Sequence, residues 1–284
     1  MSDNVREGNE VFTADQARAA GFQTRSVMRD DFGYEVPVES VPLPSCGRVY
    51  PSDSTLSGLD TVDIRAMTAR EEDILTSRAL IKKGTVITHL IQSCLVNKKI
   101  DVEEMLVGDR NAIMTSLRIT GYGSDYNAEV DCPSCGERSK QEFQLTELAI
   151  KRLKVSPVAE GANLFEFELP VTKKKVHFKF LTGKDEQEIS IMMERKKKQG
   201  AVADNLVTTR LSHALVAVSG IKDKGKINTF IRNMPARDSL ALRKFVDSNE
   251  PGLDMKTWMD CPHCMESSEV RLPMGASFFW PDTE

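Results

Sequence analysis

The sequence predicts an α+β protein that consists of two tandem, homologous units joined by one four-cysteine site. Two observations predict this architecture. First, DCPSCGE at residues 131–137 returns almost unchanged as DCPHCME at residues 260–266. Second, several longer stretches that precede these phrases also occur twice, in the same order along the 284-residue chain. Repetition of matched stretches in one order indicates an internal duplication.

Each unit is expected to begin with a strand that leads into a helix. Residues 62–67 (VDIRAM) and 176–181 (VHFKFL) alternate between apolar and polar side chains, which is the period of a strand. Thr68 and Thr182 follow, and an acidic residue lies three positions after each of them. A threonine at that place can cap a helix, and the acidic side chain favours the positive end of the helix dipole. Both stretches therefore predict strand, cap and helix.

The remainder of each unit continues with helices, a strand, the CPxC turn and a last strand. Three further pairs of stretches match in order: 87–96 with 211–220, 107–123 with 234–252, and 141–145 with 268–272. The first pair is apolar and predicts helices of about three turns. The second pair predicts a longer helix with a glycine-containing exit, in which Arg110 corresponds to Arg237. The third pair alternates and predicts a strand after each cysteine phrase.

These stretches divide the chain into three regions. The regions are a flexible polar N-terminal arm (1–41), a first unit with the knuckle Cys132/Cys135 (42–155), and a second unit with the knuckle Cys261/Cys264 and an aromatic C-terminal tail (156–284). The arm is polar and unpatterned, as is typical of a segment that orders on a partner. The second unit is longer, chiefly through the polar stretch at 193–205.

The two CPxC phrases carry four of the six cysteines and suggest a metal site. A CPxC turn, or knuckle, places two thiolates where both can reach one ion, and structural zinc usually has four cysteine or histidine ligands. Two knuckles in a duplicated fold would complete one tetrahedral shell. We therefore expect one structural Zn²⁺, bound by Cys132, Cys135, Cys261 and Cys264.

Two other uses of these cysteines are less compatible with the sequence. A redox dithiol is typically placed at a helix N-terminus that lowers the thiol pKa, whereas these pairs fall between predicted strands. A catalytic zinc keeps an open coordination position, which four thiolates would close. His263 lies inside the second knuckle, but the first knuckle has Ser134 there, so we expect His263 to be exposed.

The rest of the sequence gives no sign of catalysis. The motifs HExxH and GxSxG and the P-loop do not occur. Cys94 lies in an apolar helical stretch and is expected to be a small buried side chain. His89 and His213 occupy matched positions and are expected in the core or between the units. We therefore predict that the protein is not an enzyme, and that it has neither catalytic residues nor a small-molecule substrate.

Composition and charge limit the partners. The net charge of −4 and the pI of about 5.7 give no global attraction to nucleic acid or to an anionic membrane. No apolar run approaches the roughly 20 residues that span a bilayer. The polar N-terminus lacks the apolar stretch of a secretory signal, so we expect the chain to act on the cytoplasmic side or to be released by lysis.

Two basic runs keep one alternative open, a zinc-ribbon factor that binds nucleic acid. Residues 172–175 are expected to form a hairpin turn, and residues 194–200 the solvated end of a helix. Nucleic-acid binding would favour basic residues interleaved with exposed aromatic side chains, but aromatic residues make up only 6% of this chain. We therefore expect no nucleic-acid partner.

The C-terminal tail contains three bulky aromatic residues, Phe278, Phe279 and Trp280. Such a group either folds back on the core or anchors in the pocket of a partner. The sequence leaves both alternatives open, and the three residues are candidates for partner binding.

Several of these stretches together resemble a known family. They are LPSCGRVYP, IRAMTAREEDIL, LVGDRNAIMTSLRITGYG, CPSCG, FKFLTGKDEQEI, MPARDSLALRKFV, CPHC and FFWP. This set, within about residues 43–281, resembles the T-even-type baseplate proteins of contractile-tailed bacteriophages. The resemblance implies a non-enzymatic protein of tail morphogenesis that contacts baseplate hub and tail proteins, either in the virion or in the host cytoplasm during assembly. The zinc prediction comes from the cysteine spacing, not from the family.

Overall fold

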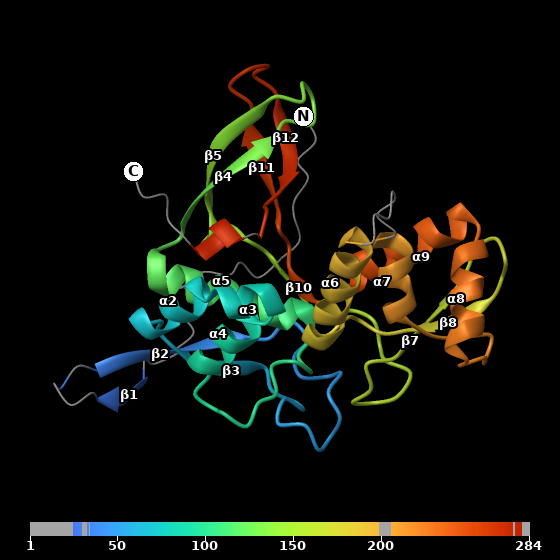
Figure 1. Cartoon of the computed structure of the whole chain (residues 1–284), viewed down its shortest axis with the longest axis horizontal. Coiled ribbons are helices and arrows are strands. Elements are labelled where there is room, and N and C mark those ends of the chain that lie inside the picture. The colour runs from blue at the N-terminus through green and yellow to red at the C-terminus, as the bar shows by residue number, and fades with distance from the viewer. Residues whose placement is uncertain (1–24, 30–32, 34, 199–205, 275, 280–284) are drawn as a thin grey trace, which may run out of the picture.

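The computed structural model describes the chain except for residues 1–24, 30–32, 34, 199–205, 275 and 280–284. The fold is mixed α+β. Helices and short sheets of the N-terminal part (25–155) lie beside those of the C-terminal part (156–279), and one β-hairpin from each part projects from the same side of the molecule (Figure 1).

The N-terminal part begins with an antiparallel sheet in the order β1-β2-β3 and continues with helices. Its elements are β1 (Arg25–Arg29), β2 (Glu35–Pro42), β3 (Thr61–Arg65), α2 (Ala69–Thr76), α3 (Arg78–Lys83), α4 (Val86–Cys94) and α5 (Val107–Tyr122). The predicted strand, cap and helix are found here. Glu71 accepts hydrogen bonds from the backbone N–H and the hydroxyl of Thr68, at 2.9 and 2.7 Å.

The folded part starts earlier than the arm prediction of 1–41 allows. Strand β2 pairs with β3 through residues 38–42, and the side chains of Val38 and Val41 are buried. Two prolines in β2, Pro37 and Pro42, conceal this strand in the sequence, because proline cannot donate to a sheet ladder. The structure accommodates Pro37 where β1 and β2 shift register. Residues 1–24 lie outside the described residues.

The C-terminal part has a similar sequence of elements. They are β7 (Phe165–Glu168), β8 (Lys175–Phe178), α6 (Gly183–Lys198), α7 (Leu206–Ala214), β9 (Leu215–Val218), α8 (Lys224–Asn233) and α9 (Ala236–Asn249). Residues 169–174 connect the antiparallel strands β7 and β8, so the predicted turn at 172–175 is found, although Lys175 already belongs to β8. Asp185 accepts from the N–H and the hydroxyl of Thr182, both at 3.0 Å, as Glu71 does from Thr68.

The prediction of one helix over residues 211–220 was wrong. The helix ends at Ala214, and the next four residues form β9, which pairs with β8 through Phe178 and Leu215. The stretch LVAV is apolar throughout, so its composition is compatible with a buried helix or a buried strand, and β-branched valines favour the strand. In the N-terminal part, Leu95 follows α4 and forms an equivalent isolated bridge with Ile64.

The two hairpins complete the fold. One consists of β4 (Asp125–Asp131) and β5 (Arg138–Gln144), and the other of β11 (Lys256–Asp260) and β12 (Ser267–Arg271). The short segments η1 (Leu145–Glu147) and β6 (Ile150–Lys151) follow the first hairpin, β10 (Gly252–Leu253) precedes the second, and η2 (Ala276–Phe279) follows it. Strands β6 and β10 pair, so the chain after the first hairpin contacts the C-terminal part.

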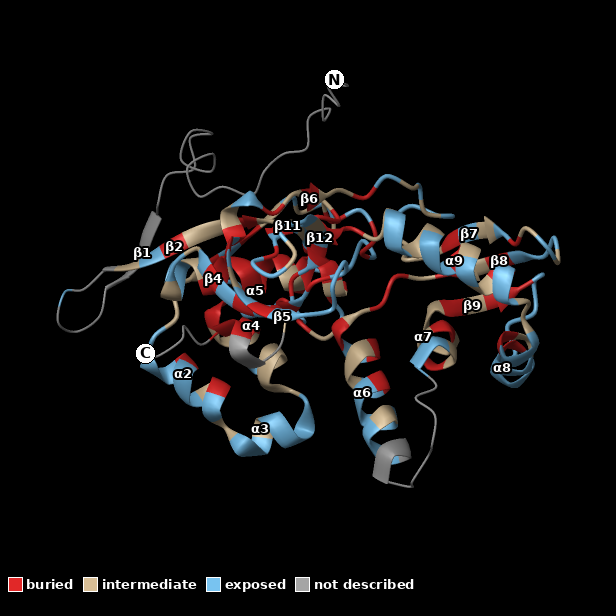
Figure 2. Cartoon of the chain, turned by 90° about the horizontal axis from the view of Figure 1, so that it is seen from above, coloured by how far each residue is buried: buried red, intermediate tan, exposed pale blue. Residues whose placement is uncertain are grey.

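One hydrophobic cluster extends through both parts (Figure 2). In the N-terminal part, α5 contributes Ile113 and Leu117, which are fully buried. In the C-terminal part, the rings of Phe165, Phe178 and Phe180 pack with centroids 4.7 to 5.8 Å apart. Burial of aromatic side chains in such clusters provides a large share of the hydrophobic stabilisation.

Backbone hydrogen bonds connect the two parts. The N–H of Val107 donates to the carbonyl oxygen of Leu181, and the N–H of Gly183 donates to that of Met105, both at 2.9 Å. These bonds hold the start of α5 against the start of α6. They are buried backbone pairs that neither part could form alone.

The start of α5 also touches the chain that leaves α9. A Cβ atom added to Gly108 would lie 1.7 Å from the carbonyl oxygen of Pro251, and the Cα atom of Gly108 is close to Gly252. Only glycine permits this approach, because every other side chain would displace backbone atoms. The contact fixes how the two parts, and therefore their hairpins, are positioned.

Candidate metal centre

The first knuckle is a tight turn between β4 and β5. The N–H of Cys132 donates to the carbonyl oxygen of Glu137 at 2.9 Å, and the N–H of Gly136 donates to that of Cys132 at 2.8 Å. Pro133 restricts the backbone at the second position of the turn, which pre-organises it. Gly136 has φ of 77°, a left-handed conformation that glycine adopts without strain. The turn leaves the Cys132 and Cys135 side chains near one another.

The second knuckle has the same hydrogen bonds. The N–H of Cys261 donates to the carbonyl oxygen of Glu266 at 3.1 Å, and the N–H of Met265 donates to that of Cys261 at 2.9 Å. Met265 occupies the place of Gly136 and has φ of 60°, although it is not glycine. A left-handed conformation costs such a residue about 1–2 kcal/mol. The turn is therefore held by its surroundings rather than by the preference of residue 265.

The hairpins bring the four predicted cysteines together. The Sγ atoms of Cys132 and Cys264 are 3.8 Å apart, and those of Cys135 and Cys261 are 3.7 Å apart. All four sulfur atoms lie within 4.8 Å of one another. A tetrahedral zinc site with bonds of about 2.3 Å would separate its sulfur atoms by roughly 3.8 Å. The four thiols could therefore hold one metal ion, and each hairpin provides half of the ligands.

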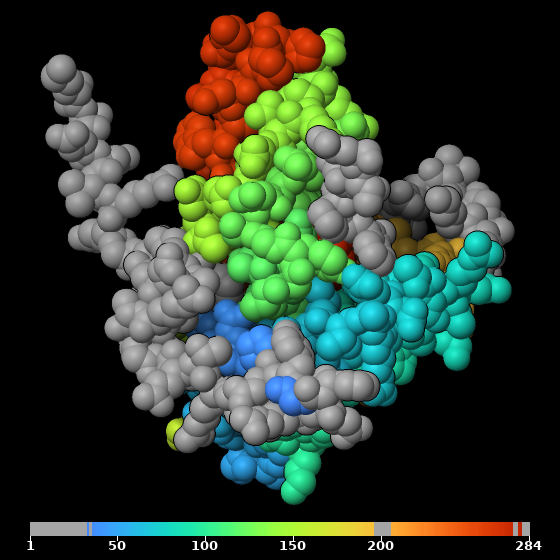
Figure 3. All heavy atoms as spheres, turned by 90° about the vertical axis from the view of Figure 1, so that its left-hand side faces the viewer, coloured from blue at the N-terminus to red at the C-terminus, as the bar shows by residue number. Residues whose placement is uncertain are grey.

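The packed faces of the hairpins form this site. Figure 3 shows the atoms of the two hairpins in contact at the top of the molecule. Cys132 and Cys261 are buried, Cys264 is half-buried, and Cys135 is exposed. The hydroxyl of Ser134 donates to Glu266 Oε2 at 3.1 Å, which connects the knuckles directly. His263 is exposed, as predicted, and the cluster found among the described residues contains cysteines only.

The thiols in this cluster ionise unequally. The N–H of Cys135 is the largest of several influences that lower the pKa of Cys132, which falls to about 7. The N–H of Glu266 favours the thiolate of Cys264, but burial and the other thiols raise the pKa of Cys264 to about 12. Thiolates packed this closely repel one another unless a cation lies between them. The donor set is therefore suited to a bound cation, which requires deprotonated sulfur.

The base of the hairpins is fixed by a buried arginine that the sequence analysis did not identify. Arg118, on α5, donates from Nε to the carbonyl oxygen of Phe278 at 2.9 Å and from its terminal nitrogens to those of Gly123 and Asp125, at 2.6 and 2.9 Å. Its side chain satisfies two carbonyl groups at the exit of α5 and one in η2. An arginine between Leu117 and Ile119 was the available signal, but it resembled a residue on the polar face of the helix.

The aromatic tail folds back on this region. Phe278 is fully buried, and its ring meets that of Tyr126 edge-on at a centroid distance of 5.2 Å. Phe279 is also buried, and Trp280 lies outside the described residues. In this structure the two phenylalanines anchor the tail to the chain's own core. A role in partner binding stays a prediction, and for Phe278 and Phe279 it requires the tail to leave that core.

The two long helices begin with equivalent aspartates. Asp109 accepts from the N–H of Ser45 at 2.9 Å, and Asp238 accepts from the N–H of Val171 at 2.7 Å. Each aspartate is the third residue of its helix, α5 or α9. The predicted match of Arg110 with Arg237 is therefore displaced by two residues. Hydroxyls from the loop before β3, those of Ser45 and Tyr50, also donate to Asp109, at 2.6 and 2.5 Å.

The other sequence candidates lie away from the cluster. Cys94 is buried in the core, as predicted. His89 is exposed rather than in the core, because α4 turns that face outward, and His213 is half-buried with its Nε2 atom 3.6 Å from a carboxylate oxygen of Glu188. The two histidines therefore do not form a common site.

The described fold and site define a mixed α+β protein in which two hairpins bring four cysteines into one potential metal site. The family model described as T4 bacteriophage base plate protein matches residues 48–280. This match covers well over half of the chain, so the protein belongs to the T4-type bacteriophage baseplate family. The resemblance in the sequence is thereby confirmed. Neither the curated proteins nor the solved structures include a significant match.

Membership of this family implies contacts with other phage tail or baseplate proteins and a place in the virion tail. Among the described residues, no helix is both long and apolar enough to cross a membrane.

Proposed function

We propose that this chain acts at the hub region of the phage baseplate, through protein–protein contacts and without catalytic activity. Its two parts are duplicated units, and one structural Zn²⁺ bound by Cys132, Cys135, Cys261 and Cys264 fixes them to each other. The chain is either a component of the finished baseplate or a factor that assembles it in the host cytoplasm.

The approach of the four sulfur atoms carries the zinc proposal. The two Sγ–Sγ distances between the hairpins, 3.8 and 3.7 Å, agree with the edge of a zinc–thiolate tetrahedron. Four thiolates would leave no coordination position for substrate, which is the arrangement of a structural ion. The ion would join sequence positions that are more than 100 residues apart, so its binding free energy would become folding free energy.

Matched ion pairs support the duplication. Arg65 on β3 forms a two-pronged pair with Glu71, with its terminal nitrogens 3.1 and 2.6 Å from the carboxylate oxygens. At the corresponding place after β8, the Lys179 ammonium lies 2.8 Å from both carboxylate oxygens of Asp185. Each pair includes the acidic residue that caps the following helix. Its recurrence is expected if one ancestral unit gave rise to both parts.

This architecture suits a connecting protein. The zinc would join the hairpin tips, and the contacts of Gly108 and Arg118 hold their bases. A body fixed at both ends presents its surfaces in one arrangement, which reduces the entropy lost when neighbours bind. Large assemblies require such pre-organised components.

Mass spectrometry of purified virions tests the role. If the chain is a structural component, it should be present in stoichiometric ratio to other baseplate proteins, and a deletion should give particles without tails. If it is an assembly factor, the deletion should have the same effect, but the chain should be absent from virions. Normal tails in the deletion strain would contradict the proposed role. Cross-links only to peripheral baseplate proteins would contradict the hub placement.

A further inference from the structure

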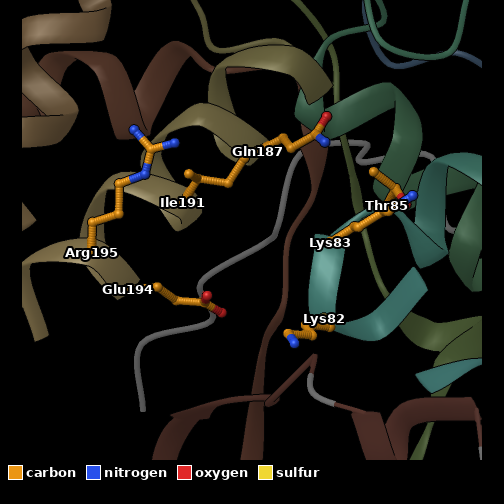
Figure 4. A pocket seen from close by; sticks show the side chains of 7 residues that line it. All are labelled: Lys82, Lys83, Thr85, Gln187, Ile191, Glu194 and Arg195. Carbon is orange, nitrogen blue, oxygen red and sulfur yellow. The ribbon is translucent and has the colours of Figure 1, made fainter. Parts of the chain in front are cut away.

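A basic pocket lies between the two parts, away from the cysteines. It has a volume of about 370 Å³ and lies between α3 of the N-terminal part and α6 of the C-terminal part. Its lining residues are Lys82, Lys83, Thr85, Gln187, Ile191, Glu194 and Arg195. Figure 4 shows that Lys82 and Glu194 reach toward the same space from opposite walls.

The charges of this pocket are unbalanced. Three cations and one carboxylate line it, although the whole chain has a net charge of −4. Within the described ranges, no carboxylate forms an ion pair with Lys82, Lys83 or Arg195. By contrast, Arg65, Lys179 and Arg210 each have a carboxylate partner within the chain. The pocket therefore concentrates positive charge that an acidic partner can neutralise.

The walls also offer apolar surface. Ile191 on α6 is the one apolar side chain of the lining, and it is 37% exposed. The hydroxyl oxygen of Thr85, which also lines the pocket, is buried and has no hydrogen-bond partner in the described part of the chain. An exposed isoleucine beside three cations suits a segment that has apolar residues on one face and acidic residues beside them.

We propose that this pocket binds an acidic amphipathic segment of a neighbouring tail or baseplate protein. The inference rests on the proposed baseplate role, since it places the partner in the same assembly. Nucleic acid fits less well, because the lining has no aromatic side chain on which a base could stack. A segment seated here contacts both parts at once, so it binds only when they are docked.

Site-specific photo-cross-linking from Ile191 tests the proposal. The full chain, with p-benzoylphenylalanine at this position, is expressed in cells infected by a deletion phage and irradiated during assembly. The cross-linked peptide is then sequenced. The expected product is a tail-protein segment with net negative charge and apolar residues at helical spacing. A product with nucleic acid, with a second copy of this chain, or with a neutral or basic segment overturns the proposal.

Charge reversal provides the matched control. Lys82→Glu with Lys83→Glu, and separately Arg195→Glu, should each reduce the yield of this adduct at least tenfold. Lys222→Glu with Lys224→Glu changes the net charge as much as the Lys82/Lys83 double variant does, but at exposed positions outside the pocket. It should leave the adduct yield within twofold of the wild type. Equal losses in all variants, or none, overturn the proposal. If tails form normally without the chain, the baseplate role itself has failed. If tails require the chain but Ile191 gives no adduct, only the pocket assignment has failed.

Discussion

The Sγ atoms of Cys132 and Cys264 lie 3.8 Å apart, although 132 residues separate them in the sequence. Each belongs to a knuckle that supplies only two potential ligands. In the proposed site the second pair of ligands comes from the other hairpin, so metal binding would be coupled to docking of the hairpins.

Replacement of any one of the four cysteines should disable the whole site. Cys132→Ser and Cys264→Ser are each expected to lose the bound metal and to reduce the free energy of unfolding by about 4 kcal/mol or more, as loss of a structural metal does. Thermal unfolding with and without EDTA measures this effect. Cys46→Ser is the control, because Cys46 is half-buried and lies outside the cluster. If Cys132→Ser kept its metal and its stability, the ligands would not be shared.

Gly108→Ala should loosen the contact between the two parts. The new Cβ atom would lie 1.7 Å from the carbonyl oxygen of Pro251, so backbone atoms must move, at a cost of about 3 kcal/mol, the upper range for overpacking. Gly121→Ala is a control on the same helix, where the Cβ atom meets only the flexible end of Met67. Chemical denaturation should give Gly121→Ala a free energy of unfolding equal to or slightly above that of the wild type, because alanine favours helix. Equal stability of the two variants would show that the close approach of Gly108 to Pro251 does not stabilise the interface between the two parts.

The Arg65–Glu71 pair should make stability depend on acidity. Burial alone would raise the pKa of Glu71, but hydrogen bonds from Arg65, Ser93 and Thr68 lower it from 4.5 to about 2. The carboxylate therefore stabilises the fold fully above pH 4.5, and this contribution is lost as the pH falls toward 2. At pH 7, Glu71→Gln should reduce the free energy of unfolding by about 3 kcal/mol, the effect of leaving one member of a buried pair alone.

The difference between wild type and Glu71→Gln should decrease between pH 5 and pH 2, which denaturant titrations at several pH values would measure. Glu166→Gln is the matched control, because Glu166 pairs with Lys175 on the surface, where both side chains are about half exposed. Such pairs contribute about 1 kcal/mol or less. A pH-independent difference for Glu71→Gln would show that its charge does not stabilise the fold.

Phe278→Ala distinguishes the two uses of the aromatic tail. If Phe278 is a core side chain, Phe278→Ala should reduce the free energy of unfolding by about 3–5 kcal/mol. Trp258→Ala serves as an aromatic control, since Trp258 is 57% exposed on β11, and it should change stability by about 0.5 kcal/mol or less. If Phe278→Ala unfolded like wild type and impaired only assembly, the residue would instead be a partner anchor.

The order of elements could be predicted because local periodicity and capping determine it. Thr68 and Thr182 precede helices, and both CPxC turns lie between strands, as expected. Strand β2 was missed because Pro37 and Pro42 are unfavourable in strands unless a register shift accommodates them. Strand β9 was taken for helix because four consecutive apolar residues have no period.

The parts of the site that depend on tertiary contacts were less accessible. The four cysteines could be grouped because their spacing is a property of the sequence. The burial of Phe278 and Phe279 and the role of Arg118 depend on how the tail crosses α5, which no local pattern specifies. Likewise, the pocket between α3 and α6 exists only where the two parts meet.

The most direct test is the zinc content of the full-length protein, purified without chelators and measured by inductively coupled plasma mass spectrometry. About one zinc ion per chain is expected, because one tetrahedral shell requires all four cysteines. The same measurement on Cys132→Ser or Cys261→Ser should give essentially none. Two zinc ions per wild-type chain would mean separate sites, and no zinc in the wild-type protein would contradict the structural metal altogether.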